Sequence, residues 1–319
     1  MEKWKELKIN TPISVIRTTF KCNRFCVFCN IPQEKYKEGE PSFSQVKREI
    51  RHLIKRNKET NISFSGGEPT LRRDLAEIIS YAKKKGAKKI EIQTNGILLS
   101  NIKLVKKLKS AGLNKAFVSL HSHSPFVHDL MVGGSNSFFL CVKGIKNLIK
   151  EKIEVTLNPV ITKFNYKDIP KFIKFVKKEF PEVKSISLSV VQPRGRAFLN
   201  KVIVPQYSTI HPYIKKALSL AEKLSILINN PYCGVPFCIG GWYKYLERCV
   251  EFCENYLKLH FGMGFNSQME KEKVKAPACK KCDLDSYCNG IWEEYAIMYS
   301  FSELRPVILS KKDAFKLFS

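Results

Sequence analysis

The sequence lacks any long apolar run. No apolar stretch approaches about 18 residues, so we expect no membrane-spanning helix. The first residues, Met1 to Glu6, contain no apolar core, so we expect no signal peptide either. Internal repeats and low-complexity tracts are also absent. Together these absences predict a globular protein that stays in the cytoplasm.

Acidic residues are scarce compared with basic ones. The chain has 29 Asp and Glu against 55 Lys and Arg, which gives a formal net charge of +26. Such an excess can indicate a nucleic-acid partner. The excess is mostly lysine, however, and it is spread through every expected helix without one dominant block, as on ordinary solvated surfaces. A nucleic-acid partner is therefore an alternative that we do not favour.

The rest of the composition is that of a folded chain with one large or two modest domains. Hydrophobic residues make up 44% and charged residues 26% of the 319 positions, which is usual for globular proteins. A chain of this length can bury a substantial core. Eleven of its residues are cysteines. Because disulfides are rare in the cytoplasm, we expect these cysteines mainly to bind metal.

Three cysteines, Cys22, Cys26 and Cys29, lie in a short loop just after an expected β-strand. A [4Fe–4S] cluster is normally held by four thiolates, so a local motif with three leaves one iron without a protein ligand. By analogy with zinc sites, an open coordination position is typical of a metal centre that does chemistry. The spacing fits neither the cysteine pairs of zinc sites nor a two-cysteine redox motif.

A second motif, Ser65-Gly66-Gly67-Glu68-Pro69-Thr70, closes the next expected strand. Together with the cysteine spacing and the aromatic residue Phe28 just before Cys29, it resembles the radical S-adenosylmethionine (SAM) superfamily. The rival interpretation is a zinc or redox site that carries a glycine motif by chance. The resemblance extends over nearly the whole chain, although its most specific motifs occupy few residues.

The resemblance implies the cofactors and the chemistry. Cys22, Cys26 and Cys29 would hold a [4Fe–4S] cluster whose open iron is chelated by SAM. A reducing partner, such as a ferredoxin or a flavodoxin, would supply one electron. SAM would then be cleaved to a 5′-deoxyadenosyl radical, which abstracts hydrogen from the substrate. In such enzymes the protein orients the cofactor and excludes water.

The resemblance also implies contacts to SAM. Gly66 and Gly67 leave room for its methionine moiety because they have no Cβ, and Glu68 can accept from its ammonium group. The backbone of Phe28 is similar to the family's contact to adenine. Further residues at strand ends match positions that face this pocket in relatives, namely Ser119, Thr94 and Asn95. The alternative for these last residues is ordinary turn chemistry.

Apolar β-type runs alternate with amphipathic stretches along the first part of the chain, which predicts parallel strands joined by helical crossovers. The expected strands are Ile13–Thr19, Asn61–Ser65, Lys89–Thr94, Ala116–Leu120, Glu154–Val160 and Ser185–Val191. The expected helices are Ser44–Lys58, Leu71–Lys85, Asn101–Ala111, Ser137–Lys150 and Tyr166–Glu179, followed by a helix at Ser208–Lys223 and a strand-like Leu224–Ile228. For the first of these helices, Ser44 is the expected N-cap and Ser42 the alternative.

Six strand–helix units are fewer than the eight of a full barrel, and composition alone also allows a doubly wound sheet. The resemblance implies a partial (β/α)6 TIM-type barrel that is open on one side. Active groups then belong at the C-terminal strand ends, where both motifs fall. We place a domain boundary near residue 230. It separates a barrel of residues 1–230 from a cysteine-rich extension of residues 231–319.

Several polar residues at expected strand ends are weaker candidates. Arg72 matches a substrate-binding arginine of the GTP-cyclising relatives, although a surface role is equally expected. Histidines after the fourth strand could touch substrate or move a proton, or they could only satisfy loop hydrogen bonds: His121, His123 and His128. Arg194 and Arg196 suit a carboxylate or phosphate group, with a charged turn as the alternative.

The extension holds the motif Cys279, Cys282 and Cys288, and Cys238 could supply a fourth thiolate from a distance. It resembles the SPASM and twitch extensions of radical SAM enzymes, which implies one auxiliary [4Fe–4S] cluster. Structural zinc is the rival, since cysteine pairs also suit a tetrahedral ion. Cys233 competes with Cys238, the roles of Cys249 and Cys253 stay open, and Cys141 is expected in the core.

The sequence thus predicts a radical SAM enzyme that oxidises a peptide, a protein or a small molecule. The alternative substrate is a nucleotide or RNA, modified by the same radical chemistry. Two non-catalytic alternatives are an iron–sulfur scaffold or electron carrier and a zinc-bound RNA adaptor.

Overall fold

The structure is a computed structural model that describes residues 13–37, 39–56, 60–261 and 272–310. In this part of the chain the main element is a seven-stranded parallel sheet with the strand order β1-β2-β3-β4-β5-β7-β9. Its strands are β1 (Ile13–Thr19), β2 (Asn61–Gly66), β3 (Lys89–Thr94), β4 (Lys115–Val118), β5 (Glu154–Leu157), β7 (Ser185–Ser187) and β9 (Leu227–Asn229).

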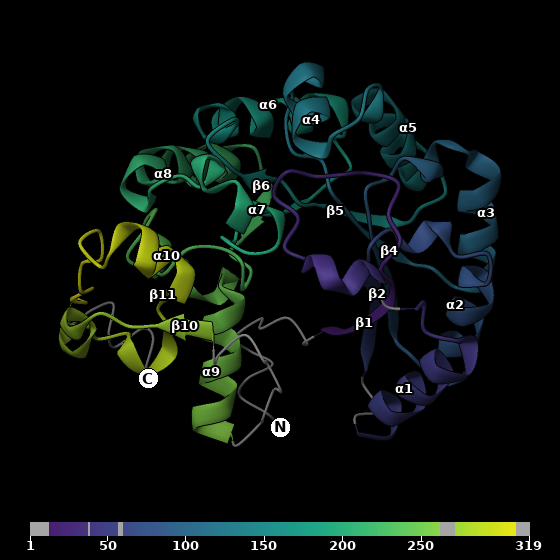
Figure 1. The fold of residues 1–319 in the computed structure, drawn as a ribbon, viewed down its shortest axis with the longest axis horizontal. Helices are drawn as coiled ribbons and strands as arrows, with labels where there is room; N and C mark the ends of the chain where they lie inside the picture. Colours follow the sequence, from purple (N-terminus) through teal and green to yellow (C-terminus); the bar gives the residue numbers. More distant parts are fainter. Residues whose placement is uncertain (1–12, 38, 57–59, 262–271, 311–319) are drawn as a thin grey trace.

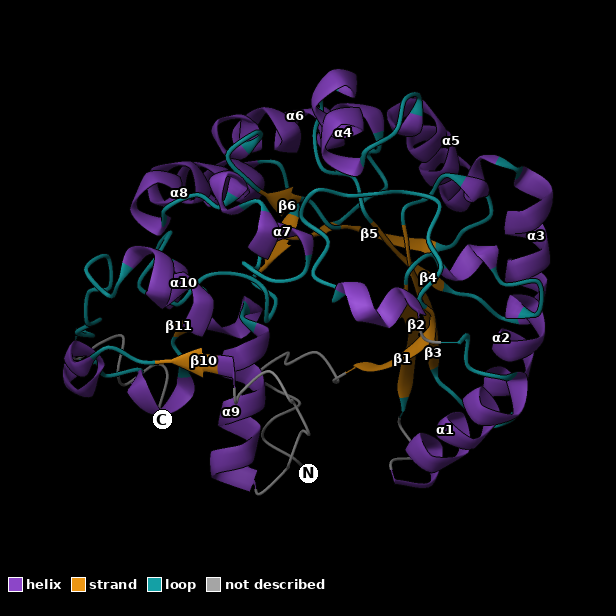
Figure 2. Cartoon of the chain, viewed as in Figure 1, coloured by secondary structure: helices purple, strands orange, loops and turns teal. Residues whose placement is uncertain are grey.

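Helices follow the strands and form an outer arc around the sheet (Figure 1). They are α1 (Phe43–Arg56), α2 (Leu75–Lys84), α3 (Ile102–Ala111), α4 (Pro125–Val132), α5 (Ser137–Lys150), α6 (Ile169–Glu179) and α8 (Tyr207–Lys223). Figure 2 shows the strands inside this arc, and the short α7 (Arg196–Leu199) also lies on its inner side. The strand order ends at β1 on one side and at β9 on the other, so the described sheet does not close into a full barrel. The expected partial barrel is confirmed, and β9 extends it by a seventh strand.

Alternation along the strands explains this layering. Ile62 and Phe64 of β2 are fully buried and belong to the same apolar cluster as Ile78 and Ile79 of α2. The intervening positions face the other side of the sheet and are polar. There Ser63 donates to Glu91 and Ser65 donates to Gln93, both at 2.7 Å. The strands therefore bury apolar side chains under the helices and turn polar side chains toward the inside of the partial barrel.

Two expected strands are each interrupted. Glu154–Val160 divides into β5 and β6 (Val160–Ile161), and Ser185–Val191 divides into β7 and β8 (Ser189–Val190). Pro159 lies at the first break and has no backbone N–H for a sheet hydrogen bond. Beyond the breaks β6 and β8 pair with each other in a separate parallel ladder.

The first helix begins earlier than expected, at Phe43, so the N-cap assignment to Ser44 is wrong. The Ser42 hydroxyl accepts from the Gln45 N–H at 3.3 Å, and the Gln45 side chain accepts from the Ser42 N–H at 2.7 Å. This reciprocal pair is a capping box, which satisfies two N–H groups that a helix start leaves unpaired. Ser42 therefore caps α1.

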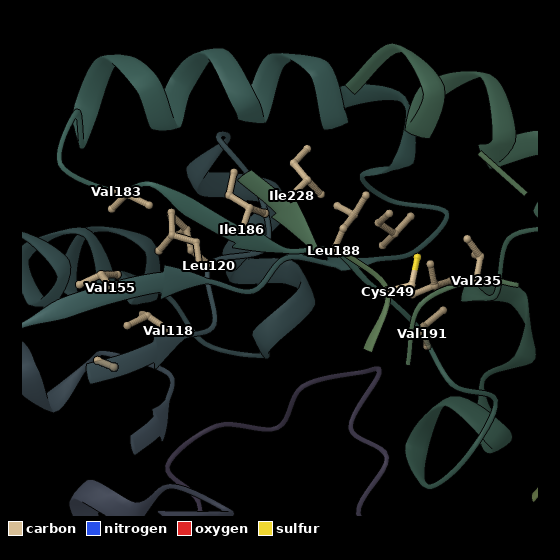
Figure 3. Packing of buried hydrophobic residues seen from close by; sticks show 14 of the residues in the cluster. Val118, Leu120, Val155, Val183, Ile186, Leu188, Val191, Ile228, Val235 and Cys249 are labelled. Atoms are coloured by element: carbon tan, nitrogen blue, oxygen red, sulfur yellow. The ribbon is translucent and has the colours of Figure 1, made fainter. Parts of the chain in front are cut away.

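The extension contains α9 (Val250–Phe261), the antiparallel pair β10 (Lys273–Val274) and β11 (Ile291–Trp292), and α10 (Glu293–Tyr299). The helices α4, α7, α9 and α10 are not among those expected from the sequence. Figure 3 shows the apolar core passing from Ile186 and Ile228 of the sheet to Val235 and Cys249 of the extension. The domain boundary near residue 230 stays a prediction, and the core crosses that position without a break.

Candidate active site

The loop that carries Cys22, Cys26 and Cys29 leaves the C-terminal end of β1 and crosses to the end of α4 (Figure 1). Phe25 donates its N–H to the Val132 carbonyl at 3.1 Å, and Val27 donates to the Met131 carbonyl at 3.0 Å. The Arg24 guanidinium donates to the Ser137 hydroxyl at 2.7 Å. The cysteine loop is therefore held from the far side of the partial barrel by α4 and the start of α5.

The three thiols of this loop are half-buried neighbours. Burial raises the pKa of Cys22, and negative charge on Glu68 and Cys29 would raise it further. Burial, followed by the neighbouring Cys29 and Cys22, raises the pKa of Cys26 to about 12, against the opposing cation of Arg196. Mutual repulsion of this kind is relieved when the thiols bind a metal centre as thiolates.

The glycine motif is joined by its backbone to the start of the cysteine loop. Gly67 donates to the Thr19 carbonyl at 2.7 Å, and Glu68 donates to the Lys21 carbonyl at 2.8 Å. Gly66 has a φ of +129°, and a Cβ there would lie 2.0 Å from the Thr19 oxygen. A Cβ on Gly67 would lie 2.1 Å from the Lys21 oxygen. This close contact with the backbone explains why both positions are glycine. The contact of either glycine with SAM stays a prediction.

Glu68 is fully buried, and its carboxylate joins β2 to the end of β3. One oxygen accepts from the N–H and the hydroxyl of Thr70, at 3.1 and 2.5 Å, and from the Thr94 hydroxyl at 2.7 Å. The other accepts from the Asn95 N–H at 2.7 Å. Burial raises the pKa of Glu68, and these hydrogen bonds oppose that shift. The second oxygen keeps room for one more donor, such as the predicted ammonium group.

Neighbouring strand ends complete the arrangement. The Asn95 side chain donates to the Asn23 side chain at 2.7 Å, which links β3 to the cysteine loop. Ser119 is half-buried at the end of β4, and its N–H donates to the Thr94 carbonyl at 2.9 Å. The Phe28 ring meets the His121 ring edge-on, with centroids 4.6 Å apart. The structure thus brings the predicted site residues together, although contact of each with SAM stays a prediction.

A second group of cysteines lines one cavity in the extension. Its volume is about 410 Å³, counting space open to solvent, and its lining includes Cys238, Cys279, Cys282 and Cys288. Burial raises the pKa of Cys238, and the neighbouring Cys279 and Cys282 add to this effect. Burial likewise raises the pKa of Cys288 to about 12, with smaller contributions from other groups that include Cys238.

The spacing of both cysteine groups bears on what they can hold. Among the described residues, no group of three or more His, Cys, Asp or Glu side chains is placed to hold a single metal ion. Thiolates on one tetrahedral zinc ion, with Zn–S bonds of about 2.3 Å, lie ~3.8 Å apart. In a [4Fe–4S] cluster each thiolate binds a different iron, so the sulfurs lie farther apart. Whether the cysteines of the extension hold a cluster or a zinc ion is therefore left as a prediction.

Comparison with known proteins gives the family. The sequence model of the Radical SAM superfamily matches residues 16–176, which contain both the cysteine loop and the glycine motif. This chain belongs to the radical SAM superfamily. A [4Fe–4S] cluster and SAM follow as its cofactors from this membership. The chain is an enzyme of that superfamily, so we set the two non-catalytic alternatives aside.

Two curated relatives span most of this radical SAM chain. A probable GTP 3′,8-cyclase of Sulfolobus acidocaldarius is 33% identical over 240 residues, which are 70% of this chain and 74% of that protein. The Fe-coproporphyrin III synthase of Methanosarcina barkeri is 31% identical over 296 residues, 91% of this chain and 71% of that protein. The crystal structure of Streptococcus suis SuiB bound to S-adenosylmethionine matches with a TM-score of 0.62 at 14% identity, covering 96% of this chain and 79% of that one. In the described residues of this chain, no helix is long and apolar enough to cross a membrane.

Two of the candidate histidines, His121 and His128, lie near the cysteine loop and accept hydrogen bonds from the backbone. His128 Nδ1 accepts from the His121 N–H, and His121 Nδ1 accepts from the Val160 N–H, both at 3.2 Å. Burial lowers the pKa of both side chains, to about 4 for His128. Both imidazoles are neutral and accept backbone hydrogen bonds. This agrees with the alternative expectation that these histidines satisfy loop hydrogen bonds. His123 lines a small cavity beside them.

Two of the three candidate arginines, Arg72 and Arg194, pair with carboxylates. Arg72 is buried and bonds the carbonyls of Thr18 and Pro41 and the carboxylate of Asp74, so it is not a surface residue. Arg194 pairs with Glu272 and Glu294, which attaches the loop after β8 to the extension. Neither guanidinium is presented to a bound anion in this arrangement.

The remaining cysteines have local partners. Cys233 donates to the Ser189 hydroxyl at 3.1 Å and is not among the residues that line the extension's cavity, whereas Cys238 is; the role of Cys238 as fourth ligand stays a prediction. Cys249 donates to the Tyr245 carbonyl and Cys253 to the Glu247 carbonyl, both at 3.5 Å. Cys141 is fully buried, as expected.

One residue at the site was missed by the sequence analysis. Tyr36 lies on the 3₁₀ helix η2 (Gln33–Lys37), and its hydroxyl is 3.1 Å from the Cys29 sulfur. Burial and this contact raise the pKa of Tyr36. No periodicity or motif marks a tyrosine seven residues after the last cysteine, because only the path of the loop brings it back to the sulfur.

Proposed function

We propose that this chain cleaves SAM reductively at a [4Fe–4S] cluster held by Cys22, Cys26 and Cys29. The 5′-deoxyadenosyl radical so formed would abstract hydrogen from a small organic molecule and begin its oxidation. One observation supports this above all. The start of the three-thiol loop is hydrogen-bonded, through the carbonyls of Thr19 and Lys21, to the Gly67–Glu68 segment.

When bound, the cluster and SAM supply an electron and a carbon-centred radical; the chain's own residues do the positioning. Glu68 is fixed by four donors, so its remaining acceptor site has a defined direction for the ammonium group of SAM. Asn95 and Ser119 bring the next strand ends to the same edge. The rings of Phe28 and His121 pack beside the loop and limit the access of water.

We further propose that Cys238, Cys279, Cys282 and Cys288 hold an auxiliary [4Fe–4S] cluster. Four thiolates leave no iron open, so such a cluster suits electron transfer better than substrate activation. It would accept the second electron when the substrate radical is oxidised to product. A low-potential reductant of the ferredoxin or flavodoxin class would return the first cluster to its reduced state.

The substrate class is inferred from the relatives. Relatives above 30% identity are named for small molecules, namely a purine nucleotide, a pterin and an iron porphyrin. The structure bound to a precursor peptide, SuiB with SuiA, is 15% identical, which supports the fold alone. We therefore favour a small heterocyclic molecule over a peptide.

A nucleotide within RNA is the second candidate, because the chain carries a formal net charge of +26. If RNA is the substrate, its binding should weaken steeply as salt rises, since cations released from phosphates drive such binding. An RNA affinity that depends neither on the salt concentration nor on the RNA sequence would count against this candidate.

The test is anaerobic reconstitution of the full chain, with iron and sulfide counting and an assay for 5′-deoxyadenosine. Wild type is compared with a Cys22/Cys26/Cys29→Ala variant, and SAM and dithionite are supplied to both. We expect about eight irons in wild type and about four in the variant, with cleavage only in wild type.

Other outcomes are equally informative. About four irons with one zinc would keep the radical reaction and make the extension a structural zinc site. Absence of 5′-deoxyadenosine together with absence of SAM binding, in a protein that holds its iron, would refute the proposed reaction.

A further inference from the structure

The Cys29 sulfur has a hydroxyl neighbour. The Tyr36 oxygen lies 3.1 Å from it, within hydrogen-bond distance for a sulfur partner. A free thiol could donate or accept in this contact. A thiolate bound to iron has no proton, so it can only accept, and Tyr36 must then be the donor. Both residues are half-buried, so water competes only partly for the contact.

The Arg196 guanidinium lies over the Tyr36 ring. The central carbon of Arg196 is 5.1 Å from the Tyr36 ring centroid and 5.2 Å from the Phe25 ring centroid. Its side chain also donates to the Cys26 carbonyl at 3.3 Å. No carboxylate in the described part of the chain pairs with Arg196, in contrast to Arg194. Its positive charge is therefore available to the cysteine loop.

The backbone fixes this arrangement. The Arg196 N–H donates to the Cys29 carbonyl at 2.9 Å. The preceding Gly195 has a φ of +54°, and a Cβ there would lie 2.4 Å from the same carbonyl oxygen. The loop after β8 therefore lies directly on the cysteine loop, and the position of Arg196 does not depend on its flexible side chain alone.

A hydroxyl donor and an uncompensated cation act on a cluster in the same direction. Reduction adds one negative charge to the iron–sulfur core and its thiolates. A hydrogen bond to a ligand sulfur and a nearby positive charge both stabilise the more negative state. Both therefore make the cluster easier to reduce.

We propose that Tyr36 and Arg196 raise the reduction potential of the cluster held by Cys22, Cys26 and Cys29. This inference rests on the proposed function, and both are positioning residues. They act through the Cys29 sulfur and the electrostatic field of the loop, and they need not touch SAM or substrate.

The test is an EPR-monitored redox titration of the anaerobically reconstituted full chain, with dithionite as reductant. The signal to follow is the one that changes when SAM is added, because only a cluster with an open iron binds SAM. Tyr36→Phe removes the donor and keeps the ring. Tyr81→Phe is the matched control, since its hydroxyl accepts from Arg51 on the outer helices and not from a group of the cysteine loop.

We expect Tyr36→Phe to lower the reduction equilibrium constant about tenfold, a shift of about 59 mV to lower potential for one electron. Arg196→Gln should shift the potential in the same direction, and Arg196→Lys should retain most of the wild-type value. Tyr81→Phe should titrate as wild type. Iron content is measured in every variant, so loss of the cluster is told apart from a change in its potential.

Wild-type potentials in both Tyr36→Phe and Arg196→Gln, at full iron content, would overturn the inference and leave the proposed function standing. If Tyr36→Phe loses its iron, the comparison of Arg196→Gln with Arg196→Lys decides alone, and equal potentials reject the inference. A wild-type protein without any SAM-sensitive signal would refute the proposed function, and the inference with it.

Discussion

The N–H of Glu68 donates a hydrogen bond of 2.8 Å to the carbonyl oxygen of Lys21, the residue before Cys22. Two residues that lie more than forty positions apart in the sequence thus join the glycine motif to the cysteine loop. Because β1 and β2 are adjacent parallel strands, their C-terminal ends emerge side by side. Any change at this contact should therefore affect the glycine motif and the cysteine loop together.

Gly67→Ala tests that contact. The new Cβ would lie 2.1 Å from the Lys21 oxygen, so one of the two backbones must move. We expect a loss of about 3 kcal/mol in the free energy of unfolding, measured by urea denaturation of the metal-free protein. Gly39→Ala is the control, because nothing lies within 4 Å of a Cβ at that position. Equal stability of the two variants would contradict the close approach.

Glu68→Gln tests the predicted contact to SAM. The amide removes the negative charge and replaces one acceptor oxygen with a donor, so the ammonium group of SAM loses its partner. A hydrogen bond between charged groups is worth about 1.5–3 kcal/mol, so the Kd for SAM should rise about tenfold or more. Isothermal titration of the reconstituted protein measures this. Glu91→Gln, at another buried carboxylate on β3, should bind SAM as wild type does, and an unchanged Kd in Glu68→Gln would refute the role.

The fourth donor in the extension is tested by a pair of single substitutions. Cys238 lines the cavity with Cys279, Cys282 and Cys288, whereas Cys233 bonds Ser189 instead. We expect Cys238→Ala to retain about four fewer irons than wild type after reconstitution, and Cys233→Ala to retain all of them. The reverse pattern would show that Cys233 is the ligand.

Acid stability should depend on His128. Burial lowers its pKa to about 4; Arg24 adds to this effect and Asp129 opposes it. The unfolded state, with a pKa near 6.5, takes up a proton first as the pH falls. The contribution of His128 to stability is therefore complete above about pH 6.5 and is lost as the pH falls to about 4, an effect on the order of 3 kcal/mol.

Denaturant unfolding of the metal-free protein between pH 7 and pH 4 measures this dependence. His128→Gln should flatten the slope, while substitution of the exposed His52 by Gln should leave it unchanged. The same slope in all three proteins would show that His128 is not the group responsible.

Much of the barrel was predictable because apolar residues recur at regular spacing in its strands and helices. The helices expected at Asn101–Ala111 and Ser137–Lys150 agree with α3 and α5, and the strand expected at Lys89–Thr94 agrees with β3. Weakly periodic elements were missed. Pro125 at the start of α4 follows a run of polar residues, and α9 lies in a region where cysteines obscure the pattern.

The sequence by itself determined the family, the cofactor chemistry and the alternation of strands and helices. Each is encoded locally, in the spacing of Cys22, Cys26 and Cys29 or in the period of apolar residues. Only the tertiary structure decided that Cys238 joins the extension's cavity, that Arg72 is buried against Thr18 and that Tyr36 reaches Cys29. These contacts depend on where loops meet in space. No local pattern in the sequence indicates which loops will meet.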